Sequence, residues 1–151
     1  MNGSIKITGS VEATLTGPDG KVKYHHIAPN VVTTVGKQYL ATWLATSTPP
    51  GTFMQYVALG SGTSAASVAD TALQIELTVA GYSRASANLL SDGTTWGSIS
   101  EFEPNNGAAN ISEIGIFSAD TAGTMFAHQV FPTITKTSVD TLTFKWYITF
   151  A

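Results

Sequence analysis

The chain has 151 residues, of which 43% are apolar and only 11% are charged, less than half of the usual charged share of about 25%. This length is enough for one compact domain, residues 1–151, and the low charge predicts a surface of Ser, Thr, Asn and Gly that packs readily against other chains. The scattered Lys and Arg argue against a basic nucleic-acid face, the lack of cysteine excludes disulfides and thiolate catalysis, and the short apolar runs argue against a membrane span and a secretory signal.

The first segment predicts a β-hairpin over residues 4–27. Apolar and polar residues alternate from Ile5 to Leu15, which is the period of a strand with one buried face. Pro18 and Gly20 are suited to the turn that follows, because proline presets φ and glycine accepts a positive φ. A second alternating segment then returns along the first.

One helix is predicted, over about residues 34–46. Thr33 or Thr34 can cap its start. Apolar residues recur at helical spacing, namely Val35, Tyr39, Leu40, Trp43 and Leu44. The segment STPPG ends the helix near Ser47. About three turns are marginal alone, so we expect the apolar stripe to lie on a sheet.

The rest of the chain predicts strands separated by turns. A strand from about Phe53 runs into Gly60 and Gly62, and Asp70 can cap a short helical turn after it. Residues 78–90 and 94–103 are predicted to form a second hairpin. Its turn is Asp92-Gly93, a strong hairpin pair.

Three further strands are predicted, over residues 111–117, 124–131 and 141–150. The last is the clearest, because large apolar residues alternate with Thr, Lys and Tyr along its whole length. Strands broken by turns, with one helix, predict a mainly β fold: an antiparallel β-sandwich or barrel with one α-helix packed on it.

The stretch YVALGSGTSAA, residues 56–66, has the form of a glycine-rich phosphate loop. Such a loop requires a following helix and a second parallel strand, and a P-loop requires a Lys followed by Ser or Thr. None of these follows Gly62. We therefore expect Gly60 and Gly62 to allow close approach of strands or subunits, and we expect no cofactor.

The three histidines suggest two chemistries. His25 and His26 are adjacent on a strand, so they point to opposite faces and do not easily hold one metal ion. A Ser-His-Asp triad lacks a G-x-S-x-G motif to carry its serine. We expect no catalytic or metal site, although a mixed site of histidines and carboxylates from separate segments stays an alternative.

Two side-chain pairs on the predicted strand 94–103 suggest carbohydrate chemistry. Glu101 and Glu103 share a face and could form the carboxylate pair of a glycosidase, although a solvated face is the more common reason for this spacing. Trp96 and Phe102 also share a face, where they could stack on a sugar or contact another subunit. Together with Gly60 and Gly62, these two aromatic residues are the candidate interface.

The order and spacing of several short motifs resemble those of small structural proteins of tailed bacteriophages. The motifs here are N-x-V-x-x-x-G-K at 30–37, A-L-G-x-G-T at 58–63, D-T-x-L-x-x-E at 70–76, S-E-x-G-I-F at 112–117, G-T-M at 123–125, I-x-K at 134–136 and L-T-F-x-W at 142–146. The resemblance covers most of the chain, and residues 81–108 are its least distinctive part.

The resemblance implies a virion protein and no enzyme. Small size and the lack of a fibre shaft favour a capsid decoration (cement) protein, made in the host cytoplasm, that binds the major capsid protein on the outer surface of the head. We expect a homo-oligomer, a trimer, with neither nucleic acid nor membrane as a partner. A tail-tip or tail-fibre protein that binds a host receptor is the first alternative. A cell-wall glycosidase using Glu101 and Glu103 is the second.

Overall fold

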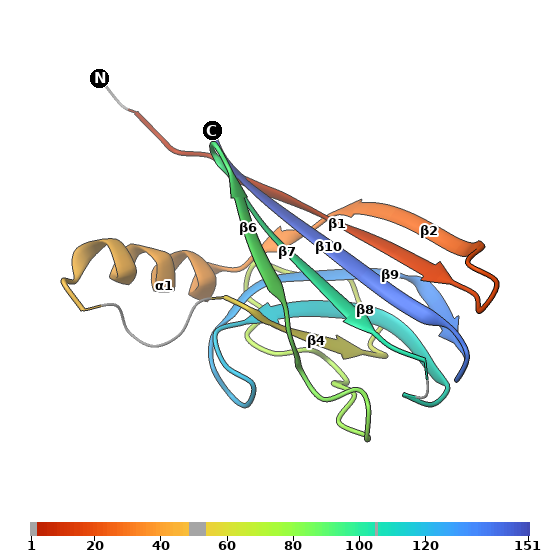
Figure 1. Cartoon of the computed structure of the whole chain (residues 1–151). Helices are drawn as coiled ribbons and strands as arrows, with labels where there is room; N and C mark the ends of the chain where they lie inside the picture. The colour runs from red at the N-terminus through yellow and green to blue at the C-terminus, as the bar shows by residue number, and fades with distance from the viewer. Residues whose placement is uncertain (1–2, 49–53, 105) are drawn as a thin grey trace.

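A computed structural model describes residues 3–48, 54–104 and 106–151, and Figure 1 shows two β-sheets stacked face to face. The first sheet has the strand order β2-β1-β10-β7-β6, and the second has the order β3-β9-β8-β4-β5. All pairings are antiparallel. The strands are β1 (Ile7–Thr16), β2 (Val22–Pro29), β3 (Val31–Val32), β4 (Tyr56–Gly60), β5 (Ala85–Ser86), β6 (Asn88–Asp92), β7 (Thr95–Phe102), β8 (Ala109–Phe117), β9 (Met125–Lys136) and β10 (Thr141–Phe150). The predicted antiparallel β-sandwich with a single helix is confirmed.

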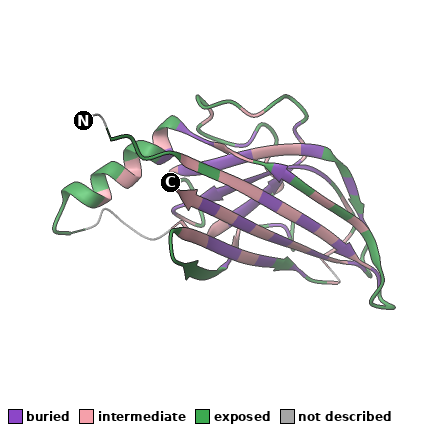
Figure 2. Ribbon diagram, turned by 90° about the horizontal axis from the view of Figure 1, so that it is seen from above, coloured by how far each residue is buried: buried purple, intermediate pink, exposed green. Residues whose placement is uncertain are grey.

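The core lies between the two sheets, and β10 lies at the centre of the first. Figure 2 shows buried and half-buried residues alternating along strands of the sandwich, as period-two patterning requires. Four of the five large apolar residues of β10 are fully buried, and Phe150 is half-buried at the strand end. Because β1 and β7 flank β10, the last strand ties the C-terminal segment into the core.

The helix α1 (Thr34–Ala45) begins where the sequence predicts, and the Thr33 hydroxyl accepts a hydrogen bond from Gly36 N at 3.0 Å. It packs on β9 through its first turn, where a Cβ on Gly36 would lie 2.7 Å from Phe126 Cα. Beyond that turn the helix projects from the end of the sandwich (Figure 1), and Leu44 is 83% exposed. The apolar stripe therefore lies on the sheet only in part.

Two segments differ from the sequence-based predictions. Residues 61–77 contain a turn but no helical turn, and residues 78–84 form no strand. The predicted hairpin is shorter than expected, because the chain leaves the second sheet after β5 and enters the first at β6. The predicted start of β4 at Phe53 lies outside the described residues.

Candidate functional site

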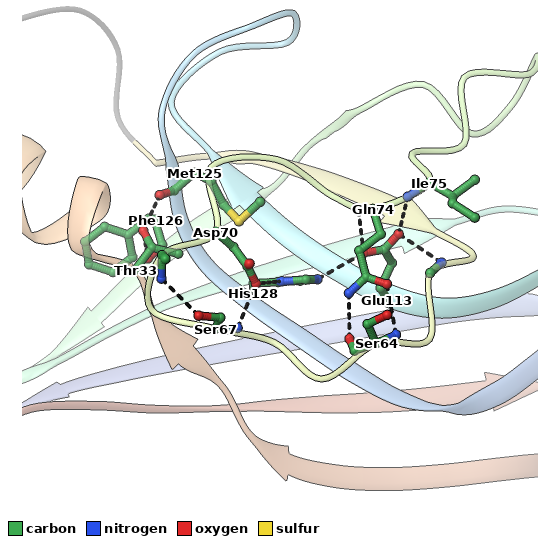
Figure 3. A network of polar contacts seen from close by, with 12 residues as sticks. Thr33, Ser64, Ser67, Asp70, Gln74, Ile75, Glu113, Met125, Phe126 and His128 are labelled. Atoms are coloured by element: carbon green, nitrogen blue, oxygen red, sulfur yellow. Dashed lines mark hydrogen bonds and ion pairs between the residues drawn. The ribbon is translucent and has the colours of Figure 1, made fainter.

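The second sheet carries a buried carboxylate on its outer face, covered by residues 61–77. Glu113 lies on β8 and is 0% exposed. Its Oε1 accepts hydrogen bonds from Gly62 N at 2.9 Å and Ile75 N at 2.8 Å, and its Oε2 accepts one from Gln74 N at 3.0 Å. Figure 3 shows the covering segment wrapped around this side chain. One carboxyl group thus accepts hydrogen bonds from three backbone N–H groups of the covering segment.

His128 on β9 lies beside Glu113 and extends the network (Figure 3). Its Nε2 is 3.0 Å from Glu113 Oε2, and its Nδ1 is 2.7 Å from Asp70 Oδ2. Asp70 also accepts a hydrogen bond from Ser67 N at 2.7 Å. Burial opposes ionisation of Asp70, but the bonds from Ser67 N and His128 outweigh it, so the pKa of Asp70 is lowered. We call Glu113, His128 and Asp70 the loop clamp.

In the loop clamp, both ring nitrogens of His128 contact carboxyl groups of the chain. Because both nitrogens face carboxylate oxygens, neither faces a serine hydroxyl. Among the described residues, no group of three or more His, Asp or Glu is arranged to hold a metal ion. The hydrogen bonds of the clamp fasten residues 61–77 to the second sheet.

The glycines of YVALGSGTSAA make this fastening sterically possible. A Cβ on Gly60 would lie 2.6 Å from Glu113 Cγ and 2.6 Å from the Ile75 carbonyl oxygen. A Cβ on Gly62 would lie 2.5 Å from Gln74 Cβ. The close approach expected from the sequence occurs within one chain. The glycine-rich loop does bind an anion, but that anion is the carboxylate of Glu113.

The pairing of Glu113 with His128 was not predicted from the sequence. The available signal was a charged residue inside ISEIGIF, a segment otherwise suited to full burial, because a buried carboxylate requires donors. Leu73 reinforces the loop by packing with Ala58, Phe117 and Met125 in a small cluster on the same outer face.

The other two histidines lie on β2, far from the loop clamp in sequence. His25 is exposed on the outer face of the first sheet, and its Nε2 is 2.8 Å from Glu12 Oε1. His26 pairs across the strands with Ala13, a residue of the core face, and its ring lies 6.1 Å from that of Tyr24. The neighbouring histidines thus belong to opposite faces.

The carboxylate pair lies at the end of β7. Glu101 is exposed, Glu103 follows the last residue of the strand, and burial together with the nearby Glu103 raises the pKa of Glu101. Neither side chain lines the two pockets described below. The pair therefore lies on an open part of the surface, where a sugar ring would have few contacts.

The two candidate aromatic residues have different surroundings. Phe102 is only 2% exposed and stacks with Tyr82 at a centroid distance of 6.2 Å, so it belongs to the core and cannot contact a partner from there. Trp96 is half-buried and borders an apolar pocket of about 190 Å³ between α1 and the end of the sandwich. The lining residues are Tyr39, Leu40, Trp43, Met54, Trp96, Phe126, Ile148 and Phe150.

A second pocket, of about 340 Å³, lies beside Arg84. The guanidinium donates to both carboxylate oxygens of Glu76, at 2.7 and 3.0 Å, and to the carbonyls of Ala119 and Ala122. Its Cζ lies 3.7 Å from the centroid of the Phe117 ring. Arg84 thus holds two loops together, and most of its donors are engaged within the chain.

A buried acid closes the turn between β9 and β10. Asp140 accepts hydrogen bonds from Lys23 Nζ at 2.9 Å, from Thr137 N at 2.9 Å and from the Thr137 hydroxyl at 2.7 Å. Burial alone would raise the pKa of Asp140, but the bonds from Lys23 and Thr137 outweigh it and lower the pKa from 3.8 to about 2.

This lowered pKa predicts a loss of stability in acid. The unfolded chain takes up the proton of Asp140 near its ordinary pKa, whereas the folded chain does so only near 2. The stabilisation, on the order of 2 kcal/mol, is therefore complete above about pH 4 and disappears as the pH falls toward 2. Urea unfolding of the wild type and Asp140→Asn should show a difference in free energy that shrinks over this range. A constant difference would contradict the prediction.

No helix in the described part of the chain has both the length and the apolar character that a membrane crossing requires. Comparisons with models of protein families, with curated proteins and with solved structures give no significant match. The function proposed below therefore rests on the sequence motifs and on the geometry of the chain.

Proposed function

We propose that the chain is a decoration (cement) protein of a tailed-bacteriophage capsid. It would lie on the outer surface of the assembled head as a homo-oligomer, bind the major capsid protein and stabilise the shell by protein–protein packing. The proposal excludes a catalytic role.

The observation that carries this proposal is the use made of the motif residues. Gly60, Gly62, Asp70 and Glu113 belong to the phage-like motifs, and all four build the fastening of residues 61–77. Two further motif residues act in the same way: Gly36 brings α1 against β9, and Glu76 holds Arg84. Motifs whose residues serve the architecture are expected in a protein that works through its shape.

The fastened segment offers a contact surface for a shell. The loop clamp holds residues 61–77 against the second sheet, while Val68 and Ile75 remain 54% and 59% exposed. The Val68 carbonyl also accepts a hydrogen bond from Thr34 N at 2.8 Å, which ties the loop to α1. Apolar side chains on a preorganised loop bind at a lower entropic cost than those on a mobile one.

Binding to heads tests the proposal. Purified protein mixed with undecorated capsids of the same virus should co-sediment with them and saturate at a fixed number of copies per capsid. Val68→Asp should weaken this binding roughly tenfold, because a charge would be buried at the interface. Val22→Asp is the matched control, since Val22 is similarly exposed, at 60%, but lies on β2 in the first sheet, and it should leave binding unchanged.

The outcomes separate the alternatives. Saturable binding that Val68→Asp leaves intact would support decoration through another surface. No saturable binding to heads would overturn the proposal, and binding to host cells or to tails instead would favour the tail-tip or fibre protein.

Trp96 gives little support to glycan stacking, since its ring lies half-buried beside Phe126 at a centroid distance of 6.4 Å.

A further inference from the structure

The two sheets have four edges, formed by β2, β6, β3 and β5. Natural proteins protect such edges with short strands, proline, lysine or bulges, because unpaired N–H and C=O groups bind further strands. β3 and β5 have two residues each, and the part of β9 that β3 does not pair with carries Pro132. β2 carries Lys23 and His25, ends at Pro29 and has an irregular register near Thr16. Three of the four edges are therefore protected.

The edge at β6 lacks these protections. Its sequence is Asn-Leu-Leu-Ser-Asp, with neither proline nor lysine, and it pairs with β7 without a shift in register. All five residues are exposed. Leu90, which is 39% exposed, lies over Gly97, where an added Cβ would be 2.7 Å from Leu90 Cδ1. The strand thus offers a row of backbone groups beside an apolar side chain.

We propose that β6 pairs with β6 of a second copy of this chain, antiparallel about a two-fold axis at Leu90. Backbone groups along an edge select an extended strand as their partner, and antiparallel pairing of a strand with its own copy is self-complementary. Centring the axis on the middle residue uses the whole strand. It places the two Leu90 side chains side by side on one face, where each covers the other.

The charge pattern of β6 suits this register. Asp92 is its only charged residue, and in the proposed pairing it faces Asn88 of the other copy, because 88 and 92 are equally distant from Leu90. The two carboxylates are therefore kept apart, and each meets an amide that can donate a hydrogen bond. The pairing would join two five-stranded sheets into one continuous sheet.

This inference concerns the assembly and does not depend on the proposed function. A two-fold contact gives dimers, or even-numbered assemblies of them, in contrast to the trimer expected from the sequence. Sedimentation equilibrium should therefore give a mass of twice 15.8 kDa, or an even multiple, with a concentration-dependent share of monomer.

A lysine at the axis tests the contact. In Leu90→Lys two positive charges would face each other, and the dissociation constant should rise by at least about tenfold. Ile27→Lys is the matched control, because Ile27 is an exposed apolar residue on β2 at the opposite edge of the same sheet. It should leave the dissociation constant unchanged, and circular dichroism should show both variants folded.

Two substitutions at Asn88 test the register itself. In Asn88→Lys, the new lysine of each copy would face Asp92 of the other copy, so the dimer would gain two pairs of opposite charges. These pairs should lower the dissociation constant roughly threefold. Asn88→Asp would create two pairs of facing carboxylates and should weaken it by a similar factor. An increase in ionic strength should reduce both effects.

Several results would overturn the inference. They are a monomeric or trimeric mass, an equal effect of Leu90→Lys and Ile27→Lys, or Asn88→Lys and Asn88→Asp shifting the dissociation constant in the same direction. A trimer that still saturates capsids would overturn the β6 pairing and leave decoration standing. A β6 dimer without affinity for capsids would support the β6 pairing and overturn decoration.

Discussion

Replacing Glu113 with glutamine will lower the free energy of unfolding by about 3–5 kcal/mol, because it breaks a buried charged network from one side. The glutamine amide would place a donor against backbone N–H groups that now meet carboxylate oxygens at 2.8–3.0 Å. His128 Nε2 would face a neutral amide in place of a carboxylate. Urea unfolding at pH 7 measures the loss.

Hydrogen exchange gives this prediction a local readout. The amides of Gly62, Gln74 and Ile75 donate hydrogen bonds to Glu113. In Glu113→Gln their exchange rates should therefore rise, relative to the wild type, by more than those of the β10 amides. Glu101→Gln is the matched control: the side chain is exposed on a strand surface, and its loss should change stability by no more than about 0.5 kcal/mol. Equal stability of the two variants would contradict the role of the loop clamp.

Replacing Gly60 with valine will destabilise the fold by about 3 kcal/mol. Its Cβ would lie 2.6 Å from the Ile75 carbonyl oxygen and 2.6 Å from Glu113 Cγ. Overpacking of this kind forces side chains and backbone to move. Here the displaced side chain is Glu113, so the steric cost also weakens the hydrogen bonds of the loop clamp. Thermal and urea unfolding should both show the effect.

Gly3→Val provides the comparison for Gly60→Val. No heavy atom lies within 4 Å of a Cβ added at Gly3, so the same change in composition should leave stability nearly unchanged. If Gly60→Val were as stable as Gly3→Val, residues 61–77 could not approach Glu113 as closely as described. We expect no nucleotide binding in the wild type or in either variant, because the backbone N–H of Gly62 already donates to Glu113 Oε1.

Strands whose one face is buried were the most predictable part of the fold. β1 and β10 alternate apolar and polar residues over ten positions each, and both form close to the predicted limits. The start of α1 was equally readable, since Thr33 and Gly36 satisfy a local capping rule. Such patterns depend on neighbours in sequence, so the sequence contains them in full.

Segments that depend on distant partners were predicted poorly. Asp70 was expected to cap a helical turn, yet its carboxylate bonds to Ser67 N and to His128, which is 58 positions away. Phe102 was expected at an interface, yet it stacks on Tyr82 in the core. In each case the side chain could serve several partners, and the packing of the two sheets selected one.

By itself, the sequence determined the mainly β class, the position of the helix and the absence of a phosphate-loop context around Gly60 and Gly62. Only the tertiary structure decided what those glycines are for. They lie in a strand and loop that must pass closely over Glu113, and a buried carboxylate is stable only where several donors reach it. The backbone donors come from residues 62, 74 and 75, and the folded sheet brings them and the His128 ring to one point.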